Sequence, residues 1–287
     1  LFPNATAAES QDANRLSLTP TGFKLHTNSS NFNTSGDTYI YMACRRPDGY
    51  VGKPAKVGTD AFAMDAANSG STIPEFDSGF PVGFGLVKEV NGVQNWFASP
   101  RLTSGKYVRT DEPNAETNLS MMAHDSNLGW GQGGFSTDYQ SWMWKRHAGF
   151  DVVTYNGQNS AFDLPHSLNA VPEMIWFKSR SNSINWYVYH KGLNGGTNPE
   201  QYSIALNTSN AESHQGSPGQ ILSLTSTHVG LNFWTGQVSQ NNYTYIAMLF
   251  ASVNGISKVG SYSGSSYDVT ITTGFTPRFV LVKKVNA

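Results

Sequence analysis

The segments Gly79-Phe80-Pro81-Val82-Gly83-Phe84-Gly85-Leu86-Val87-Lys88, Asn169-Ala170-Val171-Pro172-Glu173-Met174-Ile175-Trp176-Phe177-Lys178 and Gly274-Phe275-Thr276-Pro277-Arg278-Phe279-Val280-Leu281-Val282-Lys283 share one pattern. Each passes a proline, continues into a short apolar run and ends at a lysine. A short run that is apolar on both faces is typical of a strand buried in the middle of a sandwich. The three segments therefore predict an all-β protein.

A second motif recurs at related spacing, as Tyr39-Ile40-Tyr41-Met42, Gln140-Ser141-Trp142-Met143 and Tyr245-Ile246-Ala247-Met248. Its methionine precedes the lysine by 35 residues in the second and third copies and by 46 in the first. The difference indicates an 11-residue insertion in the first copy, in the Ala-, Asp- and Ser-rich stretch 60–71. Equal spacing of apolar motifs predicts a repeat with a period of about 100 residues, which is an ordinary domain size.

The repeat divides the chain into expected units. We expect antiparallel β-sandwiches of jelly-roll or concanavalin-like type over residues 18–120 and 121–223, with little helix. Residues 224–287 form an incomplete third repeat, for which completion of a neighbouring sandwich is one option. Residues 1–17 are expected to be a linker or an N-terminal extension.

A hairpin is expected after each lysine. Trp96 and Trp186 each follow a lysine by eight residues, and Asn91-Gly92 is a strong type I′ turn signal. The third copy reaches the position of this turn at Ala287. We therefore expect the native polypeptide to continue with a return strand that carries a tryptophan.

Composition excludes several classes of protein. The formal net charge is −1 and charged residues make up 14% of the chain, so no basic stripe for nucleic acid is present. The single cysteine, Cys44, cannot form an intrachain disulfide, and core packing must hold the fold. No apolar run is long enough to predict a membrane span.

Residues with catalytic or metal-binding chemistry are scattered. Glu75 and Asp77 have an i, i+2 spacing, but glycoside hydrolysis needs two carboxylates across one bond, and solvated loop acids are the commoner case. His147, His166 and His190 match no familiar ligand spacing, so structural roles are favoured. We therefore predict no enzyme activity, no cofactor and no metal.

The tryptophans divide into two groups. Trp96, Trp142, Trp176 and Trp186 lie in strand-like runs or at matched positions and are expected in the core. Trp130 and Trp234 lie beside glycine and polar residues, which leaves two interpretations open. A place at the core edge or in a subunit contact is favoured, because tryptophan is usually buried. The alternative is an exposed platform on which a glycan stacks.

The residues of the second copy are similar to a known family. The resemblance rests on Trp144-Lys145-Arg146-His147-Ala148-Gly149-Phe150-Asp151-Val152-Val153-Thr154-Tyr155-Asn156-Gly157, on Leu164 to Ile175, on Trp186-Tyr187-Val188-Tyr189-His190 and on Gly255 to Tyr262. These residues resemble a repeated domain of unknown function in structural proteins of tailed phages, especially cyanophages and other marine phages. The resemblance covers roughly Leu18 to the end and supplies no catalytic or binding residues.

The resemblance implies a virion protein that is assembled in the host cytoplasm. Its expected role is that of a tail, fibre or appendage module for assembly and host attachment. Its expected partners are other virion chains, in a homo-oligomer with a trimer as one option. Alternatives are a carbohydrate-binding module that recognises a host glycan without catalysis and a capsid decoration protein.

Overall fold

The computed structural model describes residues 16–19, 22–25, 33–45, 61–68, 73–146, 149–233 and 236–286. Within these ranges the chain forms β-strands and three short 3-10 helices, and no α-helix occurs there. The expectation of an all-β protein with antiparallel sheets in layers is confirmed. No helix in the described ranges is long and apolar enough to cross a membrane.

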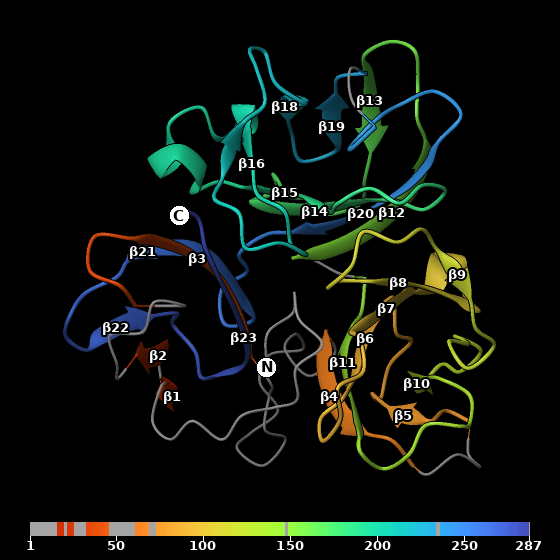
Figure 1. Cartoon of the computed structure of the whole chain (residues 1–287). Helices are drawn as coiled ribbons and strands as arrows, with labels where there is room; N and C mark the ends of the chain where they lie inside the picture. Colours follow the sequence, from red (N-terminus) through yellow and green to blue (C-terminus); the bar gives the residue numbers. More distant parts are fainter. Residues whose placement is uncertain are drawn as a thin grey trace.

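Three central sheets contain three equivalent strands in the same order and lie around the middle of the molecule (Figure 1). In the first unit the order is β4 (Phe62–Ala66), β11 (Tyr139–Trp144), β6 (Phe84–Glu89) and β7 (Phe97–Pro100), then β8 (Lys106–Arg109) and β9 (Thr117–Asn118). In the second unit it is β12 (Phe150–Asn156), β20 (Thr244–Phe250), β14 (Met174–Ser179) and β15 (Tyr187–His190). In the third unit it is β21 (Ser257–Ser263), β3 (Thr38–Arg45) and β23 (Pro277–Lys284).

A smaller sheet belongs to each unit. These sheets are β5 (Phe76–Asp77) with β10 (Gly129–Trp130), β13 (Phe162–Pro165) with β19 (His228–Leu231) and β18 (Ile221–Leu224), and β22 (Val269–Thr272) with β2 (Gly22–Leu25) and β1 (Leu16–Thr19). The remaining short elements are η1 (Arg101–Thr103), η2 (Leu193–Gly196), η3 (Pro199–Gln201), β16 (Tyr202–Ser203) and β17 (Ser213–His214). Separate apolar clusters lie between each central sheet and its smaller sheet.

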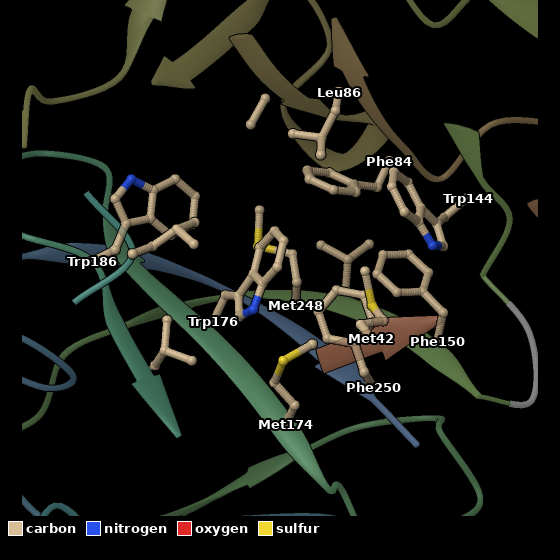
Figure 2. Close-up of a cluster of buried hydrophobic side chains, with 14 of the residues drawn as sticks. Met42, Phe84, Leu86, Trp144, Phe150, Met174, Trp176, Trp186, Met248 and Phe250 are labelled. Atoms are coloured by element: carbon tan, nitrogen blue, oxygen red, sulfur yellow. The ribbon is translucent and has the colours of Figure 1, made fainter. Parts of the chain in front are cut away.

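The opposite faces of the central sheets meet in one apolar core that all three units share. Figure 2 shows side chains of all three converging, among them Met42, Phe84, Trp176 and Met248. The strands β6 and β14 therefore bury both faces, one in the shared core and one in their own unit. This double burial explains why β6 and β14 are continuous apolar runs and not alternating ones. The run in β23 has the same composition but is half-buried.

Strand register shows which repeat positions are equivalent. Lys88 pairs with Gln140, Lys178 with Ile246 and Lys283 with Ile40. On each partner strand, the residue two positions after the partner of the lysine lies in the shared core. These residues are Trp142, Met248 and Met42, which are therefore at equivalent positions.

The expected match of Met42 with Met143 is wrong by one residue. Met143 follows Trp142 in β11 and points to the opposite face, into the first unit's own core. A shift of one residue along a strand moves the side chain to the other face of the sheet. The lysine match between Lys88 and Lys178 is correct in register.

Strand pairing also divides the chain differently from the expected boundaries. The strand with the methionine motif ends its unit, so β11 and β20 close the first and second units in sequence. The third unit joins residues 16–45 to residues 257–284. The constant spacing from Met143 to Lys178 therefore spans two units, and the expected boundaries near residues 120 and 223 both fall within units.

Candidate functional site

An open cleft of about 410 Å³ lies between the first and second units, beside β12 and β13. Its lining combines apolar groups with a guanidinium, a carboxylate and amides: Leu102, Arg146, Thr154, Asn156, Gln158, Phe162 and Asp163 are among these residues. Strand alternation creates the surface, because Thr154 and Asn156 are exposed on β12 and Tyr155 between them is half-buried. The cleft is the candidate ligand site.

A buried carboxylate holds the arginine of the cleft in place. Asp151 is 1% exposed, and its Oδ1 accepts a hydrogen bond from Arg146 Nε at 2.6 Å. Its carboxylate also accepts from the backbone N–H groups of Val152 and Ser167. Asp163, by contrast, has a side chain that is 67% exposed. A fixed guanidinium with an exposed carboxylate and amides can bind the hydroxyl groups of a polar ligand, and Phe162 supplies an aromatic surface.

The repeat lysines have a structural role that sequence analysis missed. Lys88 and Lys178 are fully buried. Lys178 Nζ donates to the carbonyl oxygens of Ser179 at 3.0 Å, Ile184 at 2.9 Å and Pro113 at 2.9 Å. Burial lowers the pKa of Lys178 to about 8. Lys88 likewise donates to backbone carbonyls of the hairpin that follows it. The repeated lysine at the end of each apolar run was the signal for this role.

Trp130 is not an exposed platform. It is fully buried, its Nε1 donates to Ser141 Oγ at 2.9 Å, and its ring stacks on Phe76 and His124. The interpretation of Trp130 as a glycan or subunit contact is therefore corrected, because the ring completes the core between two sheets. Trp234 lies outside the described residues. The expectation that four tryptophans lie in the core is confirmed for Trp96, Trp142, Trp176 and Trp186.

A family model matches the second unit, the last strand of the first unit and the C-terminal part of the third unit. The family of the domain of unknown function DUF7483 matches residues 141–287, just over half of the chain. The chain belongs to the DUF7483 family. No curated protein and no solved structure matches it.

The DUF7483 match contains part of the candidate site and excludes part. It includes the cleft strands β12 and β13 and the lysines Lys178 and Lys283. It begins in β11, the last strand of the first unit, so Leu102 on the cleft rim and Trp130 lie outside it. The cleft thus lies between the first and second units. The family match covers the second unit but, of the first unit, only its final strand.

The acids and histidines that the sequence singled out do not form a site in the described DUF7483 chain. Glu75 is fully buried and Asp77 is exposed, so the two carboxylates face different surroundings. His166 and His190 each accept a backbone N–H at Nδ1, from Leu168 and Gly192 respectively. These contacts fix the rings. His147 lies outside the described residues, and no cluster of three or more metal-ligating side chains occurs among the described ones.

Two buried histidines make the protein sensitive to acid. Burial lowers the pKa of His124 to about 3 and that of His190 to about 3, each with a nearby cation adding to the effect. In the unfolded chain a histidine titrates near 6.5, so the unfolded state binds protons first as the pH falls. This part of the stability is present above pH 6.5 and is lost between pH 6.5 and 3.

We expect the unfolding free energy to fall by up to about 1.4 kcal/mol per pH unit for each histidine between pH 6 and 4. Urea denaturation at several pH values measures this slope. The variants His124→Gln and His190→Asn should flatten it, and His228→Gln, at a half-buried ring, is the control. A double variant with the wild-type slope would contradict the assignment.

Proposed function

We propose that this DUF7483 chain is a structural module of a tailed-phage virion, in a tail, fibre or other appendage, where it contributes to assembly and host attachment. The observation that carries the structural role is the shared core, in which three sandwich units bury one face each. The resemblance of residues 142–190 to a repeated domain of tailed-phage structural proteins supports the virion part. The proposed role requires no catalysis.

Matched contacts between successive units support a rigid module. Arg180 binds Glu116 of the first unit through two hydrogen bonds of 2.9 Å, and Glu116 N–H donates back to the Arg180 carbonyl at 2.8 Å. The corresponding contact between the second and third units joins Glu212 N–H to the Val285 carbonyl at 2.7 Å. The same backbone hydrogen bond thus recurs at two junctions between units, which supports a structural role.

The position of the protein on a particle tests the proposal. Antibodies against this chain, imaged with gold label by electron microscopy, should bind the tail or its appendages in phage particles of the source. Label only on the capsid would favour the decoration alternative. Absence of the protein from purified particles, checked by mass spectrometry, would overturn the virion role.

We expect the purified chain to self-associate, because appendage modules form symmetric oligomers, often with threefold symmetry. Sedimentation velocity at 1–50 µM, on the order of usual working concentrations, measures the assembly state. A concentration-dependent shift to a trimer or a larger species is the expected result. A monomer over the whole range would count against self-assembly.

A second function, recognition of a glycan, is favoured by the cleft beside β12 and β13. Its guanidinium, exposed carboxylate, amides and aromatic ring are the groups that bind sugar hydroxyls and apolar sugar faces. Host attachment would then use this cleft directly. The binding proposed here needs no metal.

Substitution in the cleft checks the glycan proposal. We expect Asp163→Asn and Asn156→Ala to weaken binding to any host polysaccharide at least tenfold, because each removes hydrogen bonds to a partly desolvated ligand. Glycan-array and titration measurements give the affinities, and Asp125→Asn, an exposed acid of the first unit, is the matched control. Catalysis is tested separately by incubating the protein with the polysaccharide. If oligosaccharide is released and Glu75→Gln or Asp77→Asn abolishes the release, the non-catalytic role is contradicted.

A further inference from the structure

We propose that Asn254, in the link between the second and third units, is a site of spontaneous deamidation and becomes aspartate or isoaspartate as the protein ages. Asn254 lies between the end of β20 and the start of β21. The only other reactant is water. This chemistry belongs to the chain itself and is independent of the virion role.

The reaction joins the side chain of an asparagine to the backbone nitrogen of the next residue. The Gly255 nitrogen, deprotonated by hydroxide, attacks Cγ of Asn254 and forms a bond to it. The bond from Cγ to Nδ2 breaks, and Nδ2 leaves as ammonia with a proton from water. One water then opens the cyclic imide at either carbonyl carbon, so one water is consumed and one ammonia released, without oxidation or reduction. Glycine favours the attack because it has no Cβ to hinder it.

The structure distinguishes this pair from the others of its kind. The sequence contains four Asn-Gly pairs, which are Asn91-Gly92, Asn156-Gly157, Asn194-Gly195 and Asn254-Gly255. Asn254 is exposed, and a Cβ placed on Gly255 would meet no atom within 4 Å. Among the described residues, neither the Asn254 side chain nor the Gly255 N–H has a hydrogen-bond partner. Both reacting groups are therefore free to approach each other.

In two of the other pairs, hydrogen bonds hold the reacting groups. The Gly157 N–H donates to the Tyr243 carbonyl oxygen at 2.9 Å, so the nitrogen that would attack is occupied. Asn194 Nδ2 donates to the Thr197 carbonyl oxygen at 2.7 Å, and the Asn194 N–H donates to Glu212 Oε2 at 2.7 Å. These two pairs can react only when the surrounding chain opens locally.

In the remaining pair, two carboxylates lie beside the reacting groups. Asn91 Nδ2 donates to Asp138 Oδ1 at 2.9 Å. A Cβ placed on Gly92 would lie 2.1 Å from a carboxylate oxygen of Glu89, so this acid lies against the glycine. Nearby negative charges disfavour the anion that the attacking nitrogen must become. We therefore expect Asn91 to react more slowly than Asn254.

Isoaspartate would change the link between the two units. The Val253 N–H donates to the Ser257 carbonyl at 3.0 Å, and the Ser257 N–H donates back at 3.1 Å. The Ile256 N–H donates to the Val253 carbonyl at 3.0 Å, which closes a tight turn around Asn254 and Gly255. In isoaspartate the main chain runs through Cβ and gains one atom inside this turn, so these bonds cannot all be kept. We expect faster amide exchange at Ile256 and Ser257 in the aged protein.

Peptide mapping by mass spectrometry tests the site on the intact chain, incubated warm and at mildly alkaline pH in water enriched in heavy oxygen. Each new product takes up one heavy oxygen, which separates it from earlier deamidation. We expect product at Asn254 to accumulate at least tenfold faster than at Asn156 or Asn194. In the urea-unfolded chain the four pairs should react at similar rates, because only the fold separates them. Similar rates at Asn254 and Asn156 in the folded chain would refute the proposal.

The variant Asn254→Gln is the matched control. Its side chain is one methylene longer, which makes the ring larger and its formation far slower. The variant should give no product at this position and should keep slow exchange at Ile256 and Ser257 after incubation. Asn91→Gln, by contrast, should leave the product at Asn254 unchanged. If exchange in the link rises equally with age in the wild type and in Asn254→Gln, deamidation does not loosen the turn and that part of the proposal is wrong.

Discussion

The variant Trp176→Ala is expected to lower the unfolding free energy by about 3–5 kcal/mol, the usual cost of removing a large aromatic side chain from a core. Trp176 is 2% exposed, and its ring lies 5.1 Å from that of Phe250 and 6.3 Å from that of Trp186, measured between centroids. The residue lies where all three units meet. Denaturant unfolding followed by circular dichroism measures the loss, and Trp176→Phe provides a milder variant if the alanine variant does not fold.

The neighbouring residue offers a matched control for the shared core. Phe177 is also fully buried, but it faces the second unit's own cluster. Its alanine variant should cost a similar free energy, with faster amide exchange confined to the second unit. Trp176→Ala should instead raise exchange in β3 and β6 as well as in β14. Identical exchange patterns for the two variants would contradict a core that couples the three units.

The variant Lys178→Met is expected to destabilise the protein by about 2–4 kcal/mol. Its ammonium binds three carbonyl oxygens, and each buried acceptor left without a donor costs on the order of 1 kcal/mol. The carbonyl of Pro113 belongs to the first unit, so the contact between units should loosen as well. Urea denaturation measures the loss, and Lys106→Met, with a side chain 43% exposed, is the control that should change stability by less than about 1 kcal/mol.

The pH dependence of this variant gives an independent check. The folded pKa of Lys178 is about 8, below the 10.5 of a free lysine, so the unfolded state binds more protons between these values. Wild-type stability should therefore rise with pH between 8 and 10.5 on account of this group, and Lys178→Met should lose that contribution. If Lys178→Met changes neither the free energy of unfolding nor its slope against pH, the buried lysine does not stabilise the fold.

Local patterns in the sequence predicted strands β6 and β14, because a strand that is buried on both faces consists mainly of apolar residues. The apolar runs before Lys88 and Lys178 are strands, and the tryptophans that follow each lysine are buried. At Trp130 the alternative interpretation, an exposed platform, is wrong for a physical reason. Neighbouring glycines suggested a surface loop, whereas Gly85 makes room for the ring, since a Cβ there would lie 2.4 Å from it.

The candidate cleft had no signal in the sequence. Its residues come from η1 of the first unit, from β12 and β13 of the second and from the turns before and after β12, and each is an ordinary polar or apolar residue of a strand or turn. Only the packing of one unit against the next brings Leu102 near Phe162 and Asp163. A site formed between units leaves no motif in either of them.

The sequence by itself determined that the protein is all-β, that its strands recur in related units and that a lysine ends the apolar run in each, because these properties depend on residue type and short-range spacing. Tertiary structure alone decided where each unit begins and ends. β3 pairs with β21 and β23, more than 200 positions away, and not with the strands that follow it closely. Local propensity acts over a few residues, whereas strand pairing and the shared core are settled by which surfaces bury one another best in the folded chain.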